Sequence, residues 1–226
     1  MSHLFNVNGL QLFTRDTGEG SPLLLLHGFT GSGDDWQHVF AEPIRGHRVI
    51  APDLREHGRS TNPSGSFTFA EVSRDIFALL DELSIERVKA IGMSAGANTL
   101  LHMATQQPSR IDAMIHVSGT PRFPEQARAI MRLMTPEQSP LWRHAHAFAE
   151  DRTDMNFTPE SLATITAKTL IVHGDRDPLY PVELALELYR AIPKAELWVV
   201  PNGGHGPIFG DQAGPFVQTA AAFLAG

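Results

Sequence analysis

One serine of this chain stands where a nucleophile could be held on a sharp turn. Ser94 is the centre of a Gly-x-Ser-x-Gly pentapeptide at 92–96. The apolar stretch 87–91 before it predicts a buried strand, and 97–104 after it predicts a helix. The glycines allow a tight turn and close backbone approaches that a side chain would block. A serine in this strand–turn–helix context is typical of nucleophilic catalysis, and its partners are expected at the ends of other predicted strands.

Aspartate and histidine follow two further predicted strands, at 169–174 and 196–200. Asp175 and Asp177 come after the first of these strands, and His205 comes after the second. The carboxyl ends of parallel strands lie at one edge of a sheet, where ligands bind. A serine becomes nucleophilic when an imidazole accepts its proton and a carboxylate holds the other ring nitrogen. The residues therefore predict a Ser–His–Asp set with either aspartate as the acid, and Asp211 is a more distant candidate.

Two backbone amides are the expected donors to an oxyanion. The amide of Ala95 starts the helix after Ser94, and that of Phe29 lies in a glycine-rich loop at 28–33 after a run of four leucines. Such donors stabilise the tetrahedral intermediate of acyl transfer, and losing one costs roughly 10²–10³ in rate.

Strands and helices alternate along almost the whole chain. This order is typical of an α/β fold in which a mostly parallel sheet is covered by helices on both faces. Asp34 or Asp35 is expected to cap a helix that contains Trp36. The proline-rich stretch 121–160 interrupts the alternation. We therefore expect one domain over 1–226, in which 121–160 is an insertion with helical pieces between its prolines. The expected strands are 4–7, 10–15, 22–27, 47–53, 87–91, 111–119, 169–174 and 196–200.

Several short motifs in this order resemble the α/β-hydrolase family. They are Leu25-Leu26-His27-Gly28-Phe29, Pro52-Asp53-Leu54-Arg55, His57-Gly58-Arg59-Ser60, the pentapeptide at 92–96, the block 173–181 and Gly204-His205. The resemblance implies the α/β-hydrolase fold, with Ser94 as nucleophile, Asp177 as acid and His205 as base. It also implies a lid at 121–160. The chain departs from the family in carrying Glu56 where glycine is usual, and in having a short lid.

Other histidines and acids favour structural roles. We expect His27 to fix the oxyanion loop by hydrogen bonds, and Asp53 and His57 to order the loop at 55–67. His144 and His146 are two residues apart, so on a helix they point to different faces and do not form a metal pair. His102 and His116 are expected to be structural.

The substrate pocket is expected to be apolar. Charges in 121–160 nearly balance, with five arginines against six acidic residues, so they give no indication of a charged substrate. The sequence implies neither a metal nor an organic cofactor. The residues predicted to contact substrate are Phe29, Met93, Met131, Met134, Trp142 and Phe148.

Composition excludes several other classes of protein. The 226 residues carry a net charge of −7, show no basic patch, and include no cysteine. These features argue against nucleic-acid binding, disulfides and thiol chemistry. No secretory signal is visible at the N-terminus, and the apolar runs are too short to span a membrane. A cytoplasmic protein without a membrane partner is expected.

The predicted function is a serine hydrolase acting on a carboxylic ester or similar small acyl compound. Lactone, thioester or carbon–carbon bond hydrolysis and perhydrolysis are alternatives on the same residues. Serine at position 94 argues against epoxide hydrolases and haloalkane dehalogenases, because those branches of the family use aspartate there. A ligand receptor of the same fold, without catalysis, is the alternative from another class, since fold does not fix function.

Overall fold

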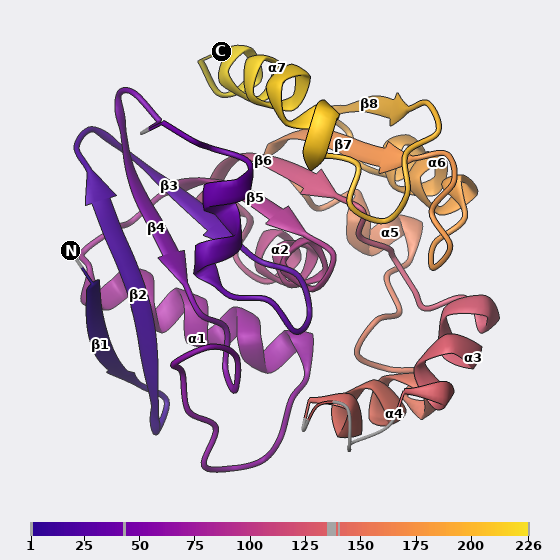
Figure 1. Cartoon of the computed structure of the whole chain (residues 1–226), viewed down its shortest axis with the longest axis horizontal. Helices are drawn as coiled ribbons and strands as arrows, with labels where there is room; N and C mark the ends of the chain where they lie inside the picture. The colour runs from indigo at the N-terminus through magenta and orange to yellow at the C-terminus, as the bar shows by residue number, and fades with distance from the viewer. Residues whose placement is uncertain (1, 43, 135–138, 140, 226) are drawn as a thin grey trace.

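An eight-stranded sheet forms the centre of the protein in the computed structural model, which describes residues 2–42, 44–134, 139 and 141–225 (Figure 1). The predicted strands are all present, with ends shifted by a few residues. The strands are β1 Ser2–Val7, β2 Leu10–Gly18, β3 Ser21–Leu26, β4 His47–Pro52, β5 Val88–Met93, β6 Ile111–Val117, β7 Lys168–Gly174 and β8 Ala195–Val200.

Helices follow most of the parallel strands. The α-helices are α1 Phe69–Glu82, α2 Ala95–Gln106, α3 Glu125–Leu133, α4 Trp142–Glu150, α5 Pro159–Leu162, α6 Val182–Ala191 and α7 Ala213–Ala225. Short 3₁₀ helices are η1 Gly33–His38, η2 Pro108–Arg110 and η3 Gly210–Gln212.

The strand order is β1-β2-β4-β3-β5-β6-β7-β8. Strand β2 pairs antiparallel with both β1 and β4, and the pairs from β4 onward are parallel. The carboxyl ends of β5, β7 and β8 therefore lie along one edge of the sheet. Ser94, the two aspartates Asp175 and Asp177, and His205 follow these strands and therefore lie at this edge.

The leucine run shows why the sheet needs cover on both faces. Leu24 and Leu26 pack in the core beneath α1, α2 and α6, whereas Leu23 and Leu25 pack in the core on the other face with η1 and α7. All four side chains are buried, as expected for a strand whose residues alternate between two covered faces. The predicted parallel sheet with helices on both faces is confirmed.

The segment 121–160, predicted to be a lid and called the lid below, leaves the body after β6 and returns before β7. The isolated bridge Arg122↔Asn156 and the bond from the Phe157 amide to the Pro121 carbonyl, 3.0 Å, join its two ends. Helices α3 and α4 lie side by side beyond the carboxyl edge of the sheet (Figure 1). Helix α5 instead packs on α2 and α6 of the body. Positions 135–138 and 140 of the predicted lid lie outside the described residues.

Buried Arg128 joins the two lid helices. The residue lies on α3 and is 2 % exposed. Its guanidinium donates to the carbonyls of Phe148, Ala149 and Asp151 at the end of α4, at distances of 2.6–2.9 Å. A cation is favoured there because the last carbonyls of a helix lack partners and carry partial negative charge.

One predicted cap is wrong. Neither Asp34 nor Asp35 is the N-cap of the segment around Trp36, which forms the 3₁₀ helix η1. The cap is Ser32, whose side chain accepts the Asp34 amide, while the Asp35 carboxylate accepts the Ser32 amide. The cap and the third residue thus form a capping box, in which serine and an acid satisfy each other's free amides.

Candidate active site

Ser94 lies on a strained turn between β5 and α2. Its backbone has φ 51° and ψ −110°, in a region that residues with a side chain rarely occupy. The Ser94 amide donates to the Val117 carbonyl at 2.8 Å, which fixes the turn to β6. A Cβ at Gly96 would lie 2.1 Å from the Leu26 carbonyl oxygen, so only glycine permits this contact with β3. Ser94 occupies the N-cap position of α2, yet its hydroxyl makes no capping bond.

The Ser94 hydroxyl bonds instead to a histidine from the loop after β8. Its Oγ lies 2.8 Å from His205 Nε2, and His205 Nδ1 lies 2.8 Å from Asp177 Oδ2. The three side chains come from loops after β5, β7 and β8. The fold therefore brings together the three residues that the sequence singled out, although they are far apart along the chain.

The Asp177 carboxylate is buried and fully engaged. Its Oδ1 accepts the amides of Leu179 and Tyr180 at 2.8 and 3.1 Å, and its Oδ2 faces His205. Burial by itself raises the pKa of Asp177, but the bond and charge of His205 and the two amides outweigh it and lower the pKa below its usual value. Asp175 and Asp211 are exposed. Geometry therefore favours Asp177 over both as the partner of His205.

The loop that carries Phe29 is held by His27. The Leu54 amide donates to His27 Nε2 at 2.9 Å, so Nδ1 carries the proton and donates to the Gly28 carbonyl at 2.7 Å. Burial lowers the pKa of His27 to about 4, which keeps the ring neutral in this role. The amide of Phe29 has no acceptor among the described residues, and the amide of Ala95 is in the first turn of α2, where no intrahelical acceptor exists.

Asp53 ties the loop at 55–67 to η1. Its buried carboxylate accepts the amides of Gly33 and Arg59, each at 2.9 Å, and the Arg59 guanidinium at 3.0 Å. His57 is buried against the rings of His27 and Phe29, with centroids 5.1 and 5.3 Å away. Burial lowers the pKa of His57 to about 3. Neither residue contacts Ser94, so both support the loop around the site.

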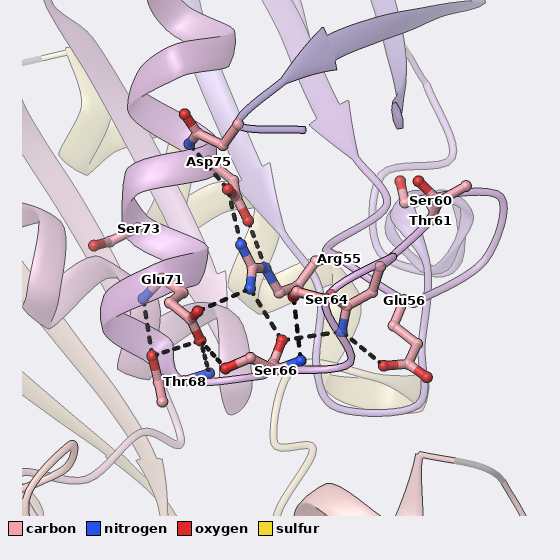
Figure 2. Close-up of polar contacts among 12 residues, drawn as sticks. Arg55, Glu56, Ser60, Thr61, Ser64, Ser66, Thr68, Glu71, Ser73 and Asp75 are labelled. Carbon is pink, nitrogen blue, oxygen red and sulfur yellow. Dashed lines mark hydrogen bonds and ion pairs between the residues drawn. The ribbon is translucent and has the colours of Figure 1, made fainter. Parts of the chain in front are cut away.

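Arg55 fastens the same loop to α1. Its guanidinium makes a two-pronged contact with Asp75, at 2.7 and 3.1 Å, and donates to the Ser66 carbonyl at 3.0 Å. Glu71 lies 3.4 Å away on the same helix (Figure 2). Both partners of the Arg55–Asp75 pair are almost fully buried. A buried charge needs this many partners to offset its lost hydration, so the loop is held rigidly at Arg55.

A cavity of about 140 Å³ opens beside Ser94 and His205, under the lid. Five of the six predicted substrate-contacting residues line it. Rings of Phe29, Trp142 and Phe148 lie together, with Phe29 5.7 and 5.5 Å from the other two. The lining residues are Phe29, Phe69, Ser94, Ala95, Asn98, Phe123, Met131, Met134, Trp142, Ala145, Phe148, Leu179, Tyr180 and His205.

Met93 is the exception. Its side chain packs with Trp198 and Phe209 in the core on the other face of the sheet, and it does not line the cavity. The Met93 Cε lies 3.7 Å from where a Cβ at Gly206 would stand, beside the loop of His205. The cavity therefore gives no support to the prediction that Met93 contacts substrate, which stays a prediction.

Sequence reasoning missed Asn98 and Tyr180. Asn98 lies one turn after Ser94 on α2, accepts the Thr120 amide at 3.0 Å and bonds the Tyr180 hydroxyl. Burial raises the pKa of Tyr180, so its phenol stays neutral. The Tyr180 ring meets the His205 ring edge-on, 5.3 Å between centroids. The spacing of Asn98, four residues after Ser94 on a predicted helix, was a usable signal.

The remaining histidines do not gather into a metal site. His144 bonds Glu56, and His146 bonds the Met134 carbonyl. His102 lies 3.4 Å from Asp154, a partner that its sequence position did not suggest, and His116 is buried beneath Gly119. Within the described ranges, no group of three histidine, cysteine or acidic side chains could hold a metal ion. None of the helices in those ranges is long and apolar enough to cross a membrane.

Comparison with known proteins agrees with the fold. The family model for the alpha/beta hydrolase fold matches residues 21–161, and a model for TAP-like proteins matches 149–225. The chain is 27% identical to the AB hydrolase superfamily protein YisY of Bacillus subtilis, over 88% of this chain and 90% of that protein. It is also 27% identical to a 2-hydroxymuconate semialdehyde hydrolase of a Pseudomonas species, over 96% and 91%.

A solved structure gives the same picture of the fold. The esterase of Thermogutta terrifontis superposes with a TM-score of 0.82 at 21% identity, over 100% of this chain and 98% of that one. The chain belongs to the α/β-hydrolase family, whose members among its relatives include hydrolases.

Proposed function

We propose that this protein is a serine hydrolase that cleaves a carboxylic ester or similar small acyl compound through an acyl-enzyme on Ser94. The observation that carries the proposal is the continuous pair of 2.8 Å contacts from Ser94 Oγ through His205 to Asp177, beside an apolar cavity. Ser94 would be the nucleophile, His205 the base and Asp177 the acid.

The direction of proton transfer follows from the partners of His205. An ionised Asp177 can only accept, so it holds the proton on Nδ1 and leaves the Nε2 lone pair directed at Ser94 Oγ. Nε2 takes the hydroxyl proton as Ser94 attacks the acyl carbon, and then gives it to the leaving group. The Asp177 carboxylate stabilises the imidazolium formed between these two steps.

The developing oxyanion would be met by the amides of Phe29 and Ala95. Both stand next to the cavity, since both residues line it. The His27 bonds fix the Phe29 loop, and the turn at Ser94 fixes Ala95, so neither donor needs to reorganise during the reaction. Water, deprotonated by His205, would then attack the acyl-enzyme and restore the serine.

The cavity favours a small or medium neutral acyl group. Its volume of about 140 Å³ is close to that of a cavity known to hold one benzene molecule, about 150 Å³. Among the described residues that line it, no lysine, arginine, aspartate or glutamate side chain is present. An anionic acyl group would therefore lose its hydration without finding a countercharge.

The test uses p-nitrophenyl esters of short acids, with a fluorophosphonate to label the serine. We expect a burst of nitrophenol followed by steady turnover, and labelling that stops when Ser94 is replaced. Ser94→Ala should lower turnover by at least about 10⁴-fold, because the nucleophile is gone. Wild-type turnover in Ser94→Ala would show that the mechanism is wrong.

A panel of lactones, thioesters and carbon–carbon bond substrates, run beside the esters, would identify the bond that is cleaved. The panel should include 2-hydroxymuconate semialdehyde, because one relative is named as its hydrolase. Tight binding of a small ligand without any turnover or labelling would instead favour a receptor.

A further inference from the structure

Glu56 has a backbone conformation that favours glycine, yet it carries a long charged side chain. Its φ is 63°, in the left-handed region, and it follows β4 at the position where the family usually has glycine. A residue with a side chain is strained there, so the side chain should have a use that offsets the strain.

We infer that Glu56 positions the lid helix α4 and thereby sets the size of acyl group that the cavity accepts. This inference rests on the proposed function, because it concerns the substrate of the same site. Four structural features connect Glu56 to the cavity. Glu56 is anchored to the body, and its carboxylate contacts the lid. The helix that makes this contact also lines the cavity, and aromatic rings join that helix to the loop of Phe29.

The base is the loop segment that Arg55 holds. The Arg55 side chain points to α1, where it meets Asp75 and Glu71, whereas the Glu56 carboxylate lies on the other side of the loop (Figure 2). Asn62 donates to Glu56 Oε2 at 2.9 Å and so orients the carboxylate. Because Arg55 is buried and paired, the neighbouring Glu56 is anchored to the body of the protein.

The contact across to the lid uses both carboxylate oxygens. Oε2 accepts from His144 Nε2 at 2.7 Å, and Oε1 pairs with the Arg143 guanidinium. The side chains of His144 and Glu56 are 6 and 18% exposed, so water competes little for the first bond. Removing the acceptor would leave a buried imidazole donor without a partner, which is costly.

Helix α4 carries the contact and the cavity wall on adjacent residues. Arg143 and His144, which bind Glu56, stand between Trp142 and Ala145, which line the cavity. A shift of the helix at His144 must therefore move Trp142 and Ala145 as well, because a helix is stiff over one turn.

A cluster of aromatic rings connects α4 to the interior of the site. The Phe67 ring, from the anchored loop, lies 5.3 Å from the His144 ring and 5.6 Å from the Phe148 ring. Phe148 in turn lies 5.5 Å from Phe29, beside the expected oxyanion donor. Fixing α4 through Glu56 therefore fixes the distance between the lid and the loop that supports acyl transfer.

The experiment compares Glu56→Gly, Glu56→Gln and a control, Glu150→Gln. Glycine suits the left-handed backbone, so Glu56→Gly should fold. Glutamine keeps an acceptor for His144 but loses the charge that pairs with Arg143. Glu150 also lies on α4, but its ion pair with Arg132, at 2.7 Å, stays within the lid and away from the cavity.

The readout is the ratio of kcat/KM for p-nitrophenyl butyrate to that for p-nitrophenyl dodecanoate. We expect Glu56→Gly to lower this ratio about tenfold, since the cavity wall loosens and a longer chain enters. Glu56→Gln should lower it less, and Glu150→Gln should leave it unchanged. The rate of Ser94 labelling by a small fluorophosphonate should be the same in all variants. A folded Glu56→Gly protein with the wild-type ratio would overturn the inference.

A second readout keeps the inference testable if the wild-type protein cleaves no ester and is not labelled, an outcome that would defeat the proposed function alone. In a Trp36→Phe, Trp198→Phe background, acrylamide quenching reports on Trp142 only. We expect Glu56→Gly to increase the quenching constant about twofold, and Glu150→Gln to leave it unchanged. Equal quenching of Trp142 with and without Glu56 would refute the inference that Glu56 positions α4, whatever reaction the protein catalyses.

Discussion

Replacing Asp177 by asparagine should change the tautomer of His205, so that the ring proton sits on Nε2 instead of Nδ1. Oδ1 of Asp177 accepts two amides, from Leu179 and Tyr180, and only an oxygen can do this. The amide nitrogen of asparagine must then occupy the other position, facing His205 Nδ1 at 2.8 Å. It donates a hydrogen bond to Nδ1, so the ring proton moves to Nε2, the nitrogen that should receive the proton of Ser94.

The expected loss follows from this wrong tautomer. With Nε2 protonated, His205 cannot act as base, and a loss of about 10⁴-fold in kcat is expected at neutral pH, as for triads of this type in general. This factor corresponds to about 5.5 kcal/mol of activation free energy, at about 1.4 kcal/mol per tenfold. The fold should survive, because asparagine has the shape of aspartate and both amide bonds to Oδ1 are retained.

The assay is steady-state hydrolysis of p-nitrophenyl butyrate, together with the rate of fluorophosphonate labelling of Ser94, and both rates should fall in parallel. Asp175→Asn is the matched control. Asp175 is exposed and lies two residues away, so its variant should stay within about twofold of wild type, as surface changes usually do. If Asp177→Asn kept more than a tenth of wild-type activity, or Asp175→Asn lost more, the assignment of the acid would be refuted.

Two further predictions concern stability. Gly96→Ala should destabilise the protein by about 3 kcal/mol, because its Cβ would meet the Leu26 carbonyl oxygen at 2.1 Å, whereas Gly204→Ala meets nothing within 4 Å and should be neutral in the same urea titration. The pKa of buried His27 is lowered to about 4, below the unfolded value of about 6.5, so the unfolded state binds the proton first and stability falls as the pH drops. In His27→Gln, the free energy of unfolding should fall by about 2 kcal/mol less between pH 7 and pH 5 than it does in the wild type. An unchanged pH dependence of that free energy would contradict a neutral His27.

Most of the fold could be predicted from the sequence because its signals are local. The leucine run requires cover on both faces of β3, and the alternation of strands and helices restricts the sheet to a mainly parallel one. One rule about strand ends pointed to Ser94, His205 and either Asp175 or Asp177, and the resemblance to the α/β-hydrolase family favoured Asp177. The structure brings these three side chains together, and their catalytic roles stay a proposal until the variants are measured.

The remaining features depend on side-chain direction and on contacts distant in sequence. Met93 adjoins Ser94, yet the end of β5 turns it to the other face. Tyr180 enters the cavity only because the amides after Asp177 wrap around the carboxylate. The partner of Glu56 lies 88 residues further along the chain, in His144. Neither periodicity nor motif spacing encodes such contacts.

The arginine that joins the two lid helices also has a consequence for how the lid forms and melts. Besides the Phe123 carbonyl, the acceptors of Arg128 are the carbonyls of Phe148, Ala149 and Asp151, which are in place only when α4 is complete to its last turn. Neither helix is long enough to be stable alone, at nine residues each. Helices α3 and α4 should therefore behave as a single cooperative unit, whose amides become protected from hydrogen exchange together and lose protection together, separately from the sheet.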